Sequence, residues 1–281
     1  MRFAVVGAGA IGSLVGGLLH RAGADVVLIA RGPHLQAMRE RGLRLLDADG
    51  TSVEVRPRCT DDLGAVAGAD SILVTLKAHA LPGIAAPLAG AAAMHAVLLF
   101  AQNGVPWWWR GPAGARLEAV DPGGTVSSAF AGRRILGCIA YPAATVVEPG
   151  VVRHEEGDRL ALGSPDGSEE AAAQELAAAF TGAGLRGRVP PRFREEVWVK
   201  LLGNATFNPV SALTRATLGE MLADPACRDL LRALMLEVEA VGRAQGLEPG
   251  VEIERRLRGA AGAAHHRSSM LQDLEAGRPL E

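Results

Sequence analysis

The sequence predicts an α/β domain with a mainly parallel sheet, followed by a domain made of helices alone. Two observations carry this prediction. In the first half of the chain, apolar runs with the length of buried strands alternate with runs of helical spacing. Beyond the double proline Pro190–Pro191, which disfavours a helix, every longer segment has helical spacing. A chain of 281 residues can form two domains, so we expect domains over 1–188 and 189–281.

The first twelve residues carry the most specific signal. The apolar run Phe3–Val6 leads into the spacing Gly-x-Gly-x-x-Gly, and an apolar helical run follows. In a dinucleotide-binding turn these glycines permit the tight turn, the approach of a pyrophosphate and the packing of helix on strand. With 35 glycines in the chain, a tight turn that binds nothing is the alternative. The flanking strand and helix favour a Rossmann-type site formed by Gly7, Ala8, Gly9, Ala10, Ile11 and Gly12.

The end of the second predicted strand, 26–30, indicates which dinucleotide binds. Folds that prefer NAD place an acidic residue there for the ribose 2′-hydroxyl, whereas an arginine accommodates the 2′-phosphate of NADP. Here the strand is followed by Arg31, whose guanidinium can donate two hydrogen bonds to a phosphate. A solvated arginine at a strand end is the alternative explanation. With the glycine turn upstream, Arg31 favours NADP as the cofactor.

Two further strand ends supply polar side chains. The run 70–77 ends in Lys77, one of only two lysines, and the run 96–104 ends in Asn103–Gly104. Ligands of open parallel sheets bind outside the carboxyl ends of the strands. We therefore expect Lys77 and Asn103 to face one cleft beside the glycine turn. Ordinary loop chemistry is the alternative, because Asn-Gly is a common turn pair.

The segments between these motifs are assigned by their spacing. Alternating runs at 43–46 and 53–56 flank Asp49–Gly50 and predict a β-hairpin. Short strands beyond residue 133 are expected to complete the first sheet with antiparallel additions. These strands are expected at 134–141, 150–154 and 159–163. Helices are expected at 35–41, 171–180, 193–207, 218–223, 226–245, 251–264 and 268–275.

The second lysine begins a polar row in an apolar helical segment. Lys200, Asn204 and Asn208 recur at four-residue steps, which places them on one helix face. Burying a lysine and two amides is costly unless polar groups meet them, so the row indicates a binding face. A partly desolvated lysine has a lowered pKa and hands over its proton readily. A solvated stripe with a surface lysine is the alternative.

Composition and the C-terminal motif narrow the class of protein. A formal net charge of −2 gives no basic field for nucleic acid, and no apolar run has the length of a membrane helix. Three scattered cysteines favour a reducing, cytoplasmic compartment. His265–His266 have no third ligand at a suitable spacing, so no metal site is expected. Ser268 or Ser269 either caps the following helix or offers a hydroxyl to a substrate.

Taken together, these motifs resemble the ketopantoate reductase family over nearly the whole chain and in the family's order. The resemblance rests on Gly7–Gly12, Arg31, Lys77, Gln102–Gly104, Lys200-x-x-x-Asn204-x-x-x-Asn208-Pro209 and Ser268–Asp273. That family reduces 2-dehydropantoate with NADPH on the route to pantothenate and coenzyme A. The resemblance implies a cleft between a Rossmann-type domain and a helical domain, with a small 2-oxo acid as the substrate.

The resemblance also implies roles for the site residues. Lys200 would be the proton donor. The implied substrate-binding residues are Asn103, Asn204, Asn208 and Ser269. The implied cofactor-binding residues are Gly7 to Gly12, Arg31, Lys77, Asn103 and Glu281, which lies twelve residues after Ser269. Family members continue through another helical segment, so we expect the chain to be truncated after Glu281.

Two departures from the family pattern leave other functions open. Leu218 stands where some members have an asparagine, and Pro106–Trp109 replaces a short glycine-containing loop. The tryptophans either pack against the second domain or form a bulky wall of the substrate pocket. One alternative function is an NADP-linked reductase of another branched 2-oxo acid. A non-catalytic NADP sensor is the other, although a sensor needs no Lys200. The oligomeric state is open, a homodimer included.

Overall fold

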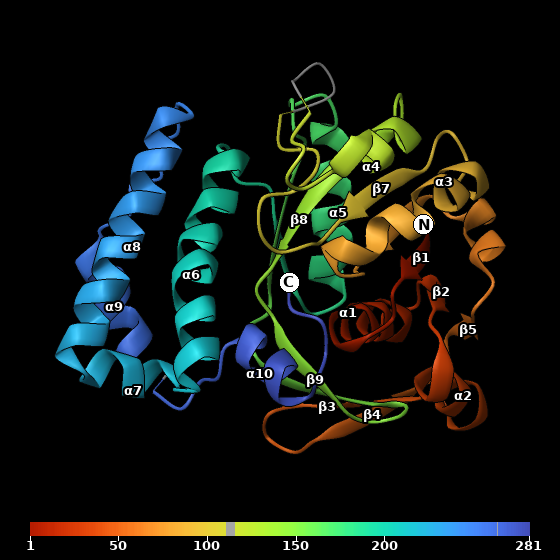
Figure 1. Cartoon of the computed structure of the whole chain (residues 1–281). Coiled ribbons are helices and arrows are strands. Elements are labelled where there is room, and N and C mark those ends of the chain that lie inside the picture. Colours follow the sequence, from red (N-terminus) through yellow and green to blue (C-terminus); the bar gives the residue numbers. More distant parts are fainter. Residues whose placement is uncertain (111–115, 263) are drawn as a thin grey trace. The chain divides into compact units, whose positions relative to one another are not determined.

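The computed structural model of the chain describes residues 1–110, 116–262 and 264–281. They form two units, one of residues 1–102 and 106–193 and the other of residues 103–105 and 194–281. The sheets belong to the first unit, and the second unit is helical (Figure 1). This division confirms the predicted fold class. The first unit ends at Phe193, compared with the limit at 188 that the double proline predicts.

The first unit is built on an eight-stranded sheet whose central part is parallel. Six neighbouring strands follow the order β5-β2-β1-β6-β7-β8 and are all parallel. This is the order 3-2-1-4-5-6 of the doubly wound dinucleotide-binding fold, which binds its ligand where the strand order reverses. That point lies between β1 and β6. The eight strands are β1 (Arg2–Val6), β2 (Asp25–Ile29), β5 (Arg58–Thr60), β6 (Ser71–Val74), β7 (Val97–Phe100), β8 (Arg134–Ala140), β11 (Arg159–Gly163) and β12 (Arg186–Arg188).

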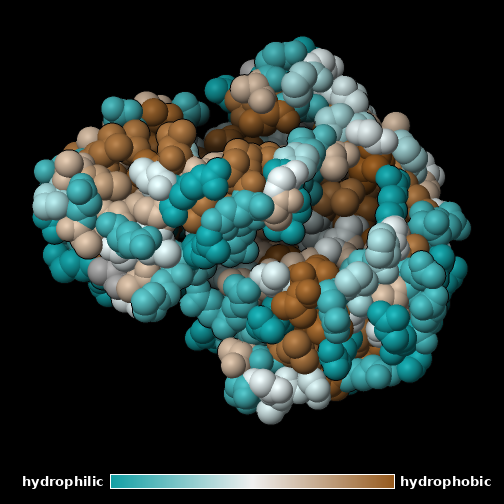
Figure 2. Space-filling model, turned by 60° about the horizontal axis from the view of Figure 1, so that its bottom comes forward, coloured by the Kyte–Doolittle hydropathy of each residue, from teal (hydrophilic) through white to brown (hydrophobic). Residues whose placement is uncertain are grey.

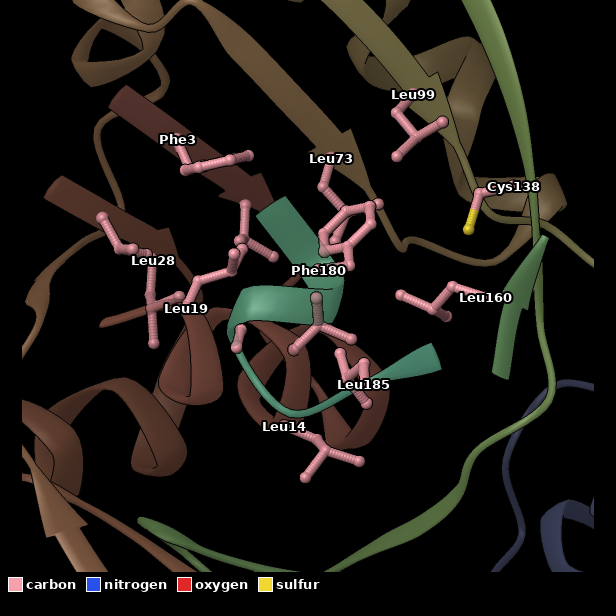
Figure 3. Packing of buried hydrophobic residues seen from close by; sticks show 14 of the residues in the cluster. Phe3, Leu14, Leu19, Leu28, Leu73, Leu99, Cys138, Leu160, Phe180 and Leu185 are labelled. Carbon is pink, nitrogen blue, oxygen red and sulfur yellow. The ribbon is translucent and has the colours of Figure 1, made fainter. Parts of the chain in front are cut away.

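Helices pack on this sheet through a continuous apolar core. Phe180 of α5 packs on Phe3 of β1 with ring centroids 6.4 Å apart, and Leu73 and Leu160 lie around Phe180 (Figure 3). Burying one such aromatic side chain contributes about 1.5–3 kcal/mol. α1 contacts α5, while α3 contacts α4 and η1. The helices are α1 (Ala10–Arg21), α2 (Gly32–Arg41), α3 (Leu81–Ala91), α4 (Thr125–Ala129) and α5 (Glu170–Gly182), with 3₁₀ turns η1 (Leu63–Gly68), η2 (Ala78–Ala80) and η3 (Pro122–Gly124).

A second sheet of four strands packs against α1 in the order β4-β3-β10-β9. Its strands β3 and β4 pair antiparallel and confirm the predicted hairpin. β10 lies parallel to β3 on one side and antiparallel to β9 on the other. The strands are β3 (Leu43–Leu46), β4 (Ser52–Val55), β9 (Ala143–Glu148) and β10 (Val151–Glu156).

The predicted completion of the main sheet by antiparallel strands is therefore correct only in part. β11 is antiparallel to β8, as predicted, but β8 itself continues the parallel order beside β7. The strand expected at 150–154 is β10, which belongs to the second sheet. The apolar sides of these strands explain the difference. Leu43, Leu45 and Val152 are buried in the core that includes α1, so the hairpin needs β10 beside it to cover this helix.

Two consecutive glycines let α1 lie between the two sheets. A Cβ atom on Gly16 would lie 2.5 Å from Leu28 of the main sheet. A Cβ atom on Gly17 would lie 3.0 Å from both Leu43 and Leu45 of the second sheet. A larger residue at either position would have to displace these leucine side chains. The helix that follows the glycine turn is therefore held closely on two sides.

The helices of the second unit enclose a core of their own. α6 (Phe193–Thr214) continues through Pro209, so the predicted helix end at Phe207 is wrong. A proline inside a helix costs about 3 kcal/mol. The turns around it bury Phe207 and Val210 in this core, and that packing favours the continued helix. The other helices are α7 (Leu218–Ala223), α8 (Pro225–Ala244), α9 (Ile253–Ala261) and α10 (Ser269–Glu275).

The unusual tryptophans pack on aromatic residues of the first unit. The ring of Trp107 lies 5.2 Å from that of Phe100 and 5.7 Å from that of Phe130. Trp108 stacks on Phe193 at 6.0 Å. Pairs at these distances contribute about 0.5–1.5 kcal/mol beyond the area that they bury. Trp107 and Trp108 therefore contribute to the aromatic core of this unit.

The surface combines hydrophilic areas with some exposed apolar side chains. Figure 2 shows hydrophobic residues in several separate groups among hydrophilic ones on this face. α8 exposes Leu230, Leu236 and Val241. Within the described residues, no helix has the length and apolar character needed to span a membrane.

Candidate active site

The turn between β1 and α1 is held by backbone hydrogen bonds. The N–H groups of Gly7 and Ala8 both donate to the carbonyl of Ile29, at 3.0 and 2.9 Å, and the N–H of Gly9 donates to the carbonyl of Gly7 at 2.6 Å. Gly7 has a φ of +96°, a conformation that side chains other than glycine's rarely permit. The turn is thereby attached to the carboxyl end of β2.

Gly7 and Gly12 leave no room for a side chain. A Cβ atom on Gly12 would lie 2.5 Å from Oγ1 of Thr75, and one on Gly7 would lie 2.8 Å from Leu76. Oγ1 of Thr75 also donates a hydrogen bond to the carbonyl of Gly7 at 2.7 Å. No sequence motif marks Thr75 or Leu76, which are distinguished only by their place after β6. The end of β6 therefore supports the glycine turn.

Gly9 differs from the other two glycines because it is exposed. A Cβ atom there would meet nothing closer than 3.9 Å. Gly9 is the N-cap residue of α1, and no side chain caps this end of the helix. The positive end of the helix and its first N–H groups can therefore bind an anion. This open cradle fits the pyrophosphate of a dinucleotide.

Arg31 lies between β2 and α2, where it is exposed as the N-cap residue of α2. Asp61, after the neighbouring strand β5, is the nearby carboxylate that sequence analysis did not identify. Its pKa is lowered mainly by the hydrogen bond that Arg39 donates at 2.8 Å, and the positive charge of Arg31 adds to the effect. Arg31 and Arg39 place two positive charges beside Asp61 at this strand end. The guanidinium of Arg31 can donate hydrogen bonds to a phosphate group.

Lys77 and Gln102 follow the carboxyl ends of β6 and β7. Lys77 is partly buried and is the N-cap residue of η2. Nε2 of Gln102 donates to the carbonyls of Val74 and Leu76, both at 2.9 Å. The Gln102 amide therefore ties β7 to the backbone that leads into Lys77. In the sequence Gln102 is marked only as part of the motif Gln102–Gly104, and the structure gives it this supporting contact.

The polar row of α6 forms a second group of candidate residues. Lys200, Asn204 and Asn208 are partly buried on α6 at the predicted four-residue spacing. Nδ2 of Asn204 donates a hydrogen bond to Oδ1 of Asn103 at 3.4 Å. These two asparagines are 101 residues apart in sequence. The structure thus brings together two side chains that were both predicted to bind the substrate.

The two serines before α10 differ in their surroundings. Ser268 is buried, and its Oγ accepts a hydrogen bond from the N–H of Leu271 at 3.1 Å, which makes it the helix cap. Ser269 is exposed, and so is Glu281 at the end of the described chain. Capping is therefore the role of Ser268. Substrate binding by Ser269 and cofactor binding by Glu281 stay predictions.

The candidate residues fall into two groups. The glycine turn, Arg31 and Lys77 belong to the first unit. The second unit holds Asn103, Lys200, Asn204, Asn208, Ser269 and Glu281. Their convergence on one cleft stays a prediction. Across residues 1–110, 116–262 and 264–281, no group of histidine, cysteine, aspartate or glutamate side chains has the arrangement of a metal site.

The doubly wound sheet and the open glycine cradle define a dinucleotide-binding protein, and the polar row of α6 adds groups suited to an oxidoreductase. Residues 3–167 match the family described as "Ketopantoate reductase PanE/ApbA", and residues 192–281 match "Ketopantoate reductase PanE/ApbA C terminal". The chain belongs to the ketopantoate reductase family and is an oxidoreductase that acts on a CH–OH group.

Individual relatives agree with this assignment over the whole chain. A 2-dehydropantoate 2-reductase of Mesorhizobium japonicum is 42% identical, across 100% of this chain and 88% of the relative. Another, from Halobacterium salinarum, is 34% identical with the same coverage of 100% and 88%. The crystal structure of a 2-dehydropantoate 2-reductase from Geobacter metallireducens has a TM-score of 0.86 and 29% identity, and the match covers 100% of this chain and 89% of that one.

Proposed function

We propose that the protein reduces 2-dehydropantoate to pantoate with NADPH as the hydride source. The observation that carries this proposal is the row of α6, in which Lys200 lies one turn before Asn204 and Asn204 is hydrogen-bonded to Asn103. A lysine can donate a proton, and the amides can bind a carboxylate and hydroxyl groups without adding charge. A hydroxylated 2-oxo acid presents a carboxylate and a hydroxyl for the amides, and a ketone oxygen that can accept the proton.

The cofactor would lie across the carboxyl ends of β1 and β2. The N–H groups at the start of α1 would bind its pyrophosphate beside Gly9, and Arg31 would bind its 2′-phosphate. Lys77 would line the same site. When bound, NADPH supplies the hydride that adds to the ketone carbon of the substrate. The protein's own contribution is to orient both ligands and to manage charge at the ketone oxygen.

Lys200 would act on that oxygen. As the carbonyl carbon gains the hydride, negative charge develops on the oxygen, and the ammonium group of Lys200 stabilises this charge and donates the proton. Asn103, Asn204, Asn208 and Ser269 would hold the carboxylate and the hydroxyl of the substrate, which fixes the ketone in place. The product is then a 2-hydroxy acid, with the proton of Lys200 on its new hydroxyl.

A pair of matched substrates tests the substrate assignment. 3,3-Dimethyl-2-oxobutanoate has the same carbon skeleton as 2-dehydropantoate but lacks the terminal hydroxyl. Because a site built to hydrogen-bond a hydroxyl leaves polar groups unpaired with such an analogue, we expect kcat/KM for 2-dehydropantoate to be higher by about 10²-fold or more. NADPH oxidation followed by absorbance measures both values. Equal kcat/KM values would favour the alternative, a reductase of another branched 2-oxo acid.

The alternative of a non-catalytic NADP sensor disagrees with the membership of the chain in a family of oxidoreductases. Such a protein would bind NADPH but would oxidise it with none of a panel of 2-oxo acids. The row of α6 favours an enzyme, because a sensor has no use for a proton donor beside two substrate-binding amides. The cytoplasmic location, the place in pantothenate biosynthesis and the homodimer stay predictions.

Two glycine substitutions test the cofactor cradle, with one serving as the control for the other. Gly12→Ala is expected to lower the free energy of unfolding by about 1–3 kcal/mol, because the new methyl group would overlap Thr75. Gly9→Ala has open space around it, so the melting temperature of the cofactor-free protein should stay near that of the wild type. Its affinity for NADPH should nevertheless fall, because the methyl group faces the proposed pyrophosphate position. Wild-type NADPH affinity in Gly9→Ala would contradict the cradle.

A further inference from the structure

A buried chain of hydrogen bonds connects the glycine turn to the helix that follows Arg31. Ser13 on the first turn of α1 is fully buried, and its Oγ lies 3.0 Å from the carbonyl oxygen of Ala8 and 3.1 Å from Nε2 of His34. Nδ1 of His34 accepts a hydrogen bond from the N–H of Gly150 at 3.0 Å. The chain therefore joins three elements: the turn before α1, the first turn of α2 and the turn between β9 and β10.

The donors and acceptors in this chain can be assigned in one way. A carbonyl oxygen only accepts, so the hydroxyl of Ser13 donates to Ala8. The Ser13 oxygen then accepts the proton on Nε2 of His34. The N–H of Gly150 only donates, so Nδ1 of His34 carries no proton. His34 is therefore neutral, and burial, which lowers the pKa of His34, favours the same state.

We propose that His34 is a positioning residue for the cofactor, which sets the spacing between the glycine turn and Arg31. His34 lies three residues after Arg31, and through Ser13 it holds the carbonyl of Ala8, in the peptide unit directly before Gly9. The inference rests on the proposed function, in which the turn at Gly9 binds the pyrophosphate and Arg31 binds the 2′-phosphate. One imidazole thus couples the two phosphate-binding positions for a single ligand.

The second sheet also holds His34 in place, through the turn between β9 and β10. Gly150 has a φ of +84°, and a Cβ atom on it would lie 3.0 Å from that of Ala37 in α2. The β9–β10 turn is therefore packed closely on the helix that carries His34. With Nδ1 held by Gly150 and Nε2 held by Ser13, the ring cannot rotate without losing both hydrogen bonds.

Two conservative variants separate the two hydrogen bonds of the imidazole. The amide nitrogen of His34→Gln can take the place of Nε2–H and keep the contact with Ser13. The amide oxygen of His34→Asn can take the place of Nδ1 and keep the contact with Gly150, but it leaves Ser13 without its donor. Ser13→Ala removes the link to Ala8 from the other side. Each variant is made in the full chain, with its melting temperature measured without cofactor.

The experiment compares the affinities for NADPH and NADH. NADH lacks the 2′-phosphate, so its affinity does not depend on the spacing between the glycine turn and Arg31. We expect His34→Asn and Ser13→Ala to weaken NADPH binding about tenfold, the effect of one lost hydrogen bond, while NADH binding changes by less than about threefold. His34→Gln should keep NADPH binding within about threefold of the wild type. At saturating NADPH, kcat should stay close to wild type in all three, because none of them alters Lys200. Fluorescence titration and steady-state kinetics give these values.

The imidazole itself provides a readout that needs no cofactor. Nitrogen NMR of the cofactor-free protein should show His34 as the neutral ring with its proton on Nε2. A signal for the other tautomer, or for a charged ring at pH 7, would overturn the inference. Unchanged NADPH affinity in both His34→Asn and Ser13→Ala would overturn it as well. So would an equal loss of NADPH and NADH affinity, which would show a structural role alone.

These outcomes are distinct from failure of the proposed function. If the wild type bound NADPH no more tightly than NADH, the proposed contact between Arg31 and the 2′-phosphate would be wrong, and the inference would fall with it. If the wild type preferred NADPH and His34→Asn kept the full preference, the cofactor assignment would stand and only the role of His34 would be rejected.

Discussion

Replacing Lys200 with alanine is expected to lower kcat for 2-dehydropantoate reduction by about 10²- to 10⁴-fold, the usual contribution of a general acid. The negative charge that Lys200 would neutralise exists mainly in the transition state, so its loss should appear in turnover far more than in ligand binding. Steady-state kinetics give kcat, and fluorescence titration gives the affinity for NADPH. NADPH affinity should stay near that of the wild type.

Asn204→Ala is the matched control on the same helix face. Asn204 lies one turn after Lys200 and is hydrogen-bonded to Asn103, so its removal should loosen the substrate and act chiefly on KM. Circular dichroism of both variants shows whether the overall helix content is retained. A Lys200→Ala protein with near-normal kcat would remove the lysine from its proposed role. A larger loss of kcat in Asn204→Ala than in Lys200→Ala would show that Lys200 is the wrong residue for the proton transfer.

Arg31→Ala is expected to reduce NADPH affinity about thirtyfold, which corresponds to about 2 kcal/mol for a lost bidentate phosphate contact. NADH affinity should change little, because NADH has no phosphate at this position. The ratio of the two dissociation constants, measured by titration at one salt concentration, isolates the effect from any general change in the protein. An equal affinity of the wild type for both cofactors would refute the assignment.

Two further substitutions, of Arg44 and of Asp61, serve as controls for the charge change in Arg31→Ala. Arg44 in the second sheet pairs with Glu148 at 3.1 Å, and its side chain is about as exposed as a typical surface arginine. Arg44→Ala should leave the NADPH to NADH ratio unchanged, which controls for the loss of one positive charge. Asp61→Asn should raise NADPH affinity, because it removes a carboxylate near Arg31. A fall in NADPH affinity in Asp61→Asn would show that this carboxylate supports the site.

The sequence predicted the features that depend on short segments. The glycine turn is local: its three glycines, the preceding strand and the following helix lie within about twenty residues. The row on α6 is also local, since four-residue spacing places Lys200, Asn204 and Asn208 on one face of any helix. Both features are present in the structure. The hairpin of β3 and β4 was predictable for the same reason, because its turn and its strands are adjacent.

The features that sequence analysis missed depend on contacts between distant segments. No local pattern shows that β10 pairs with β3 instead of joining the main sheet, because that choice depends on which apolar sides are left uncovered after α1 has packed. The helix predicted to end at Phe207 continues through Pro209, because tertiary packing of Phe207 and Val210 overrides the local preference. The chain from Ala8 through Ser13 and His34 to Gly150 joins residues that are unremarkable in the sequence.

Because α1 lies between two sheets, the two ends of the proposed nucleotide site differ in how far they tolerate substitutions. On one side, Gly16 and Gly17 contact the sheets so closely that even a methyl group would have to displace leucine side chains. On the other side, Arg31 and Asp61 are exposed, so new side chains there meet water. If the proposed site is correct, substitutions at its ribose end can therefore change the preferred nucleotide without disturbing the core. At the proposed pyrophosphate end, Gly7 and Gly12 allow no such change, because a Cβ atom there would overlap Leu76 and Thr75.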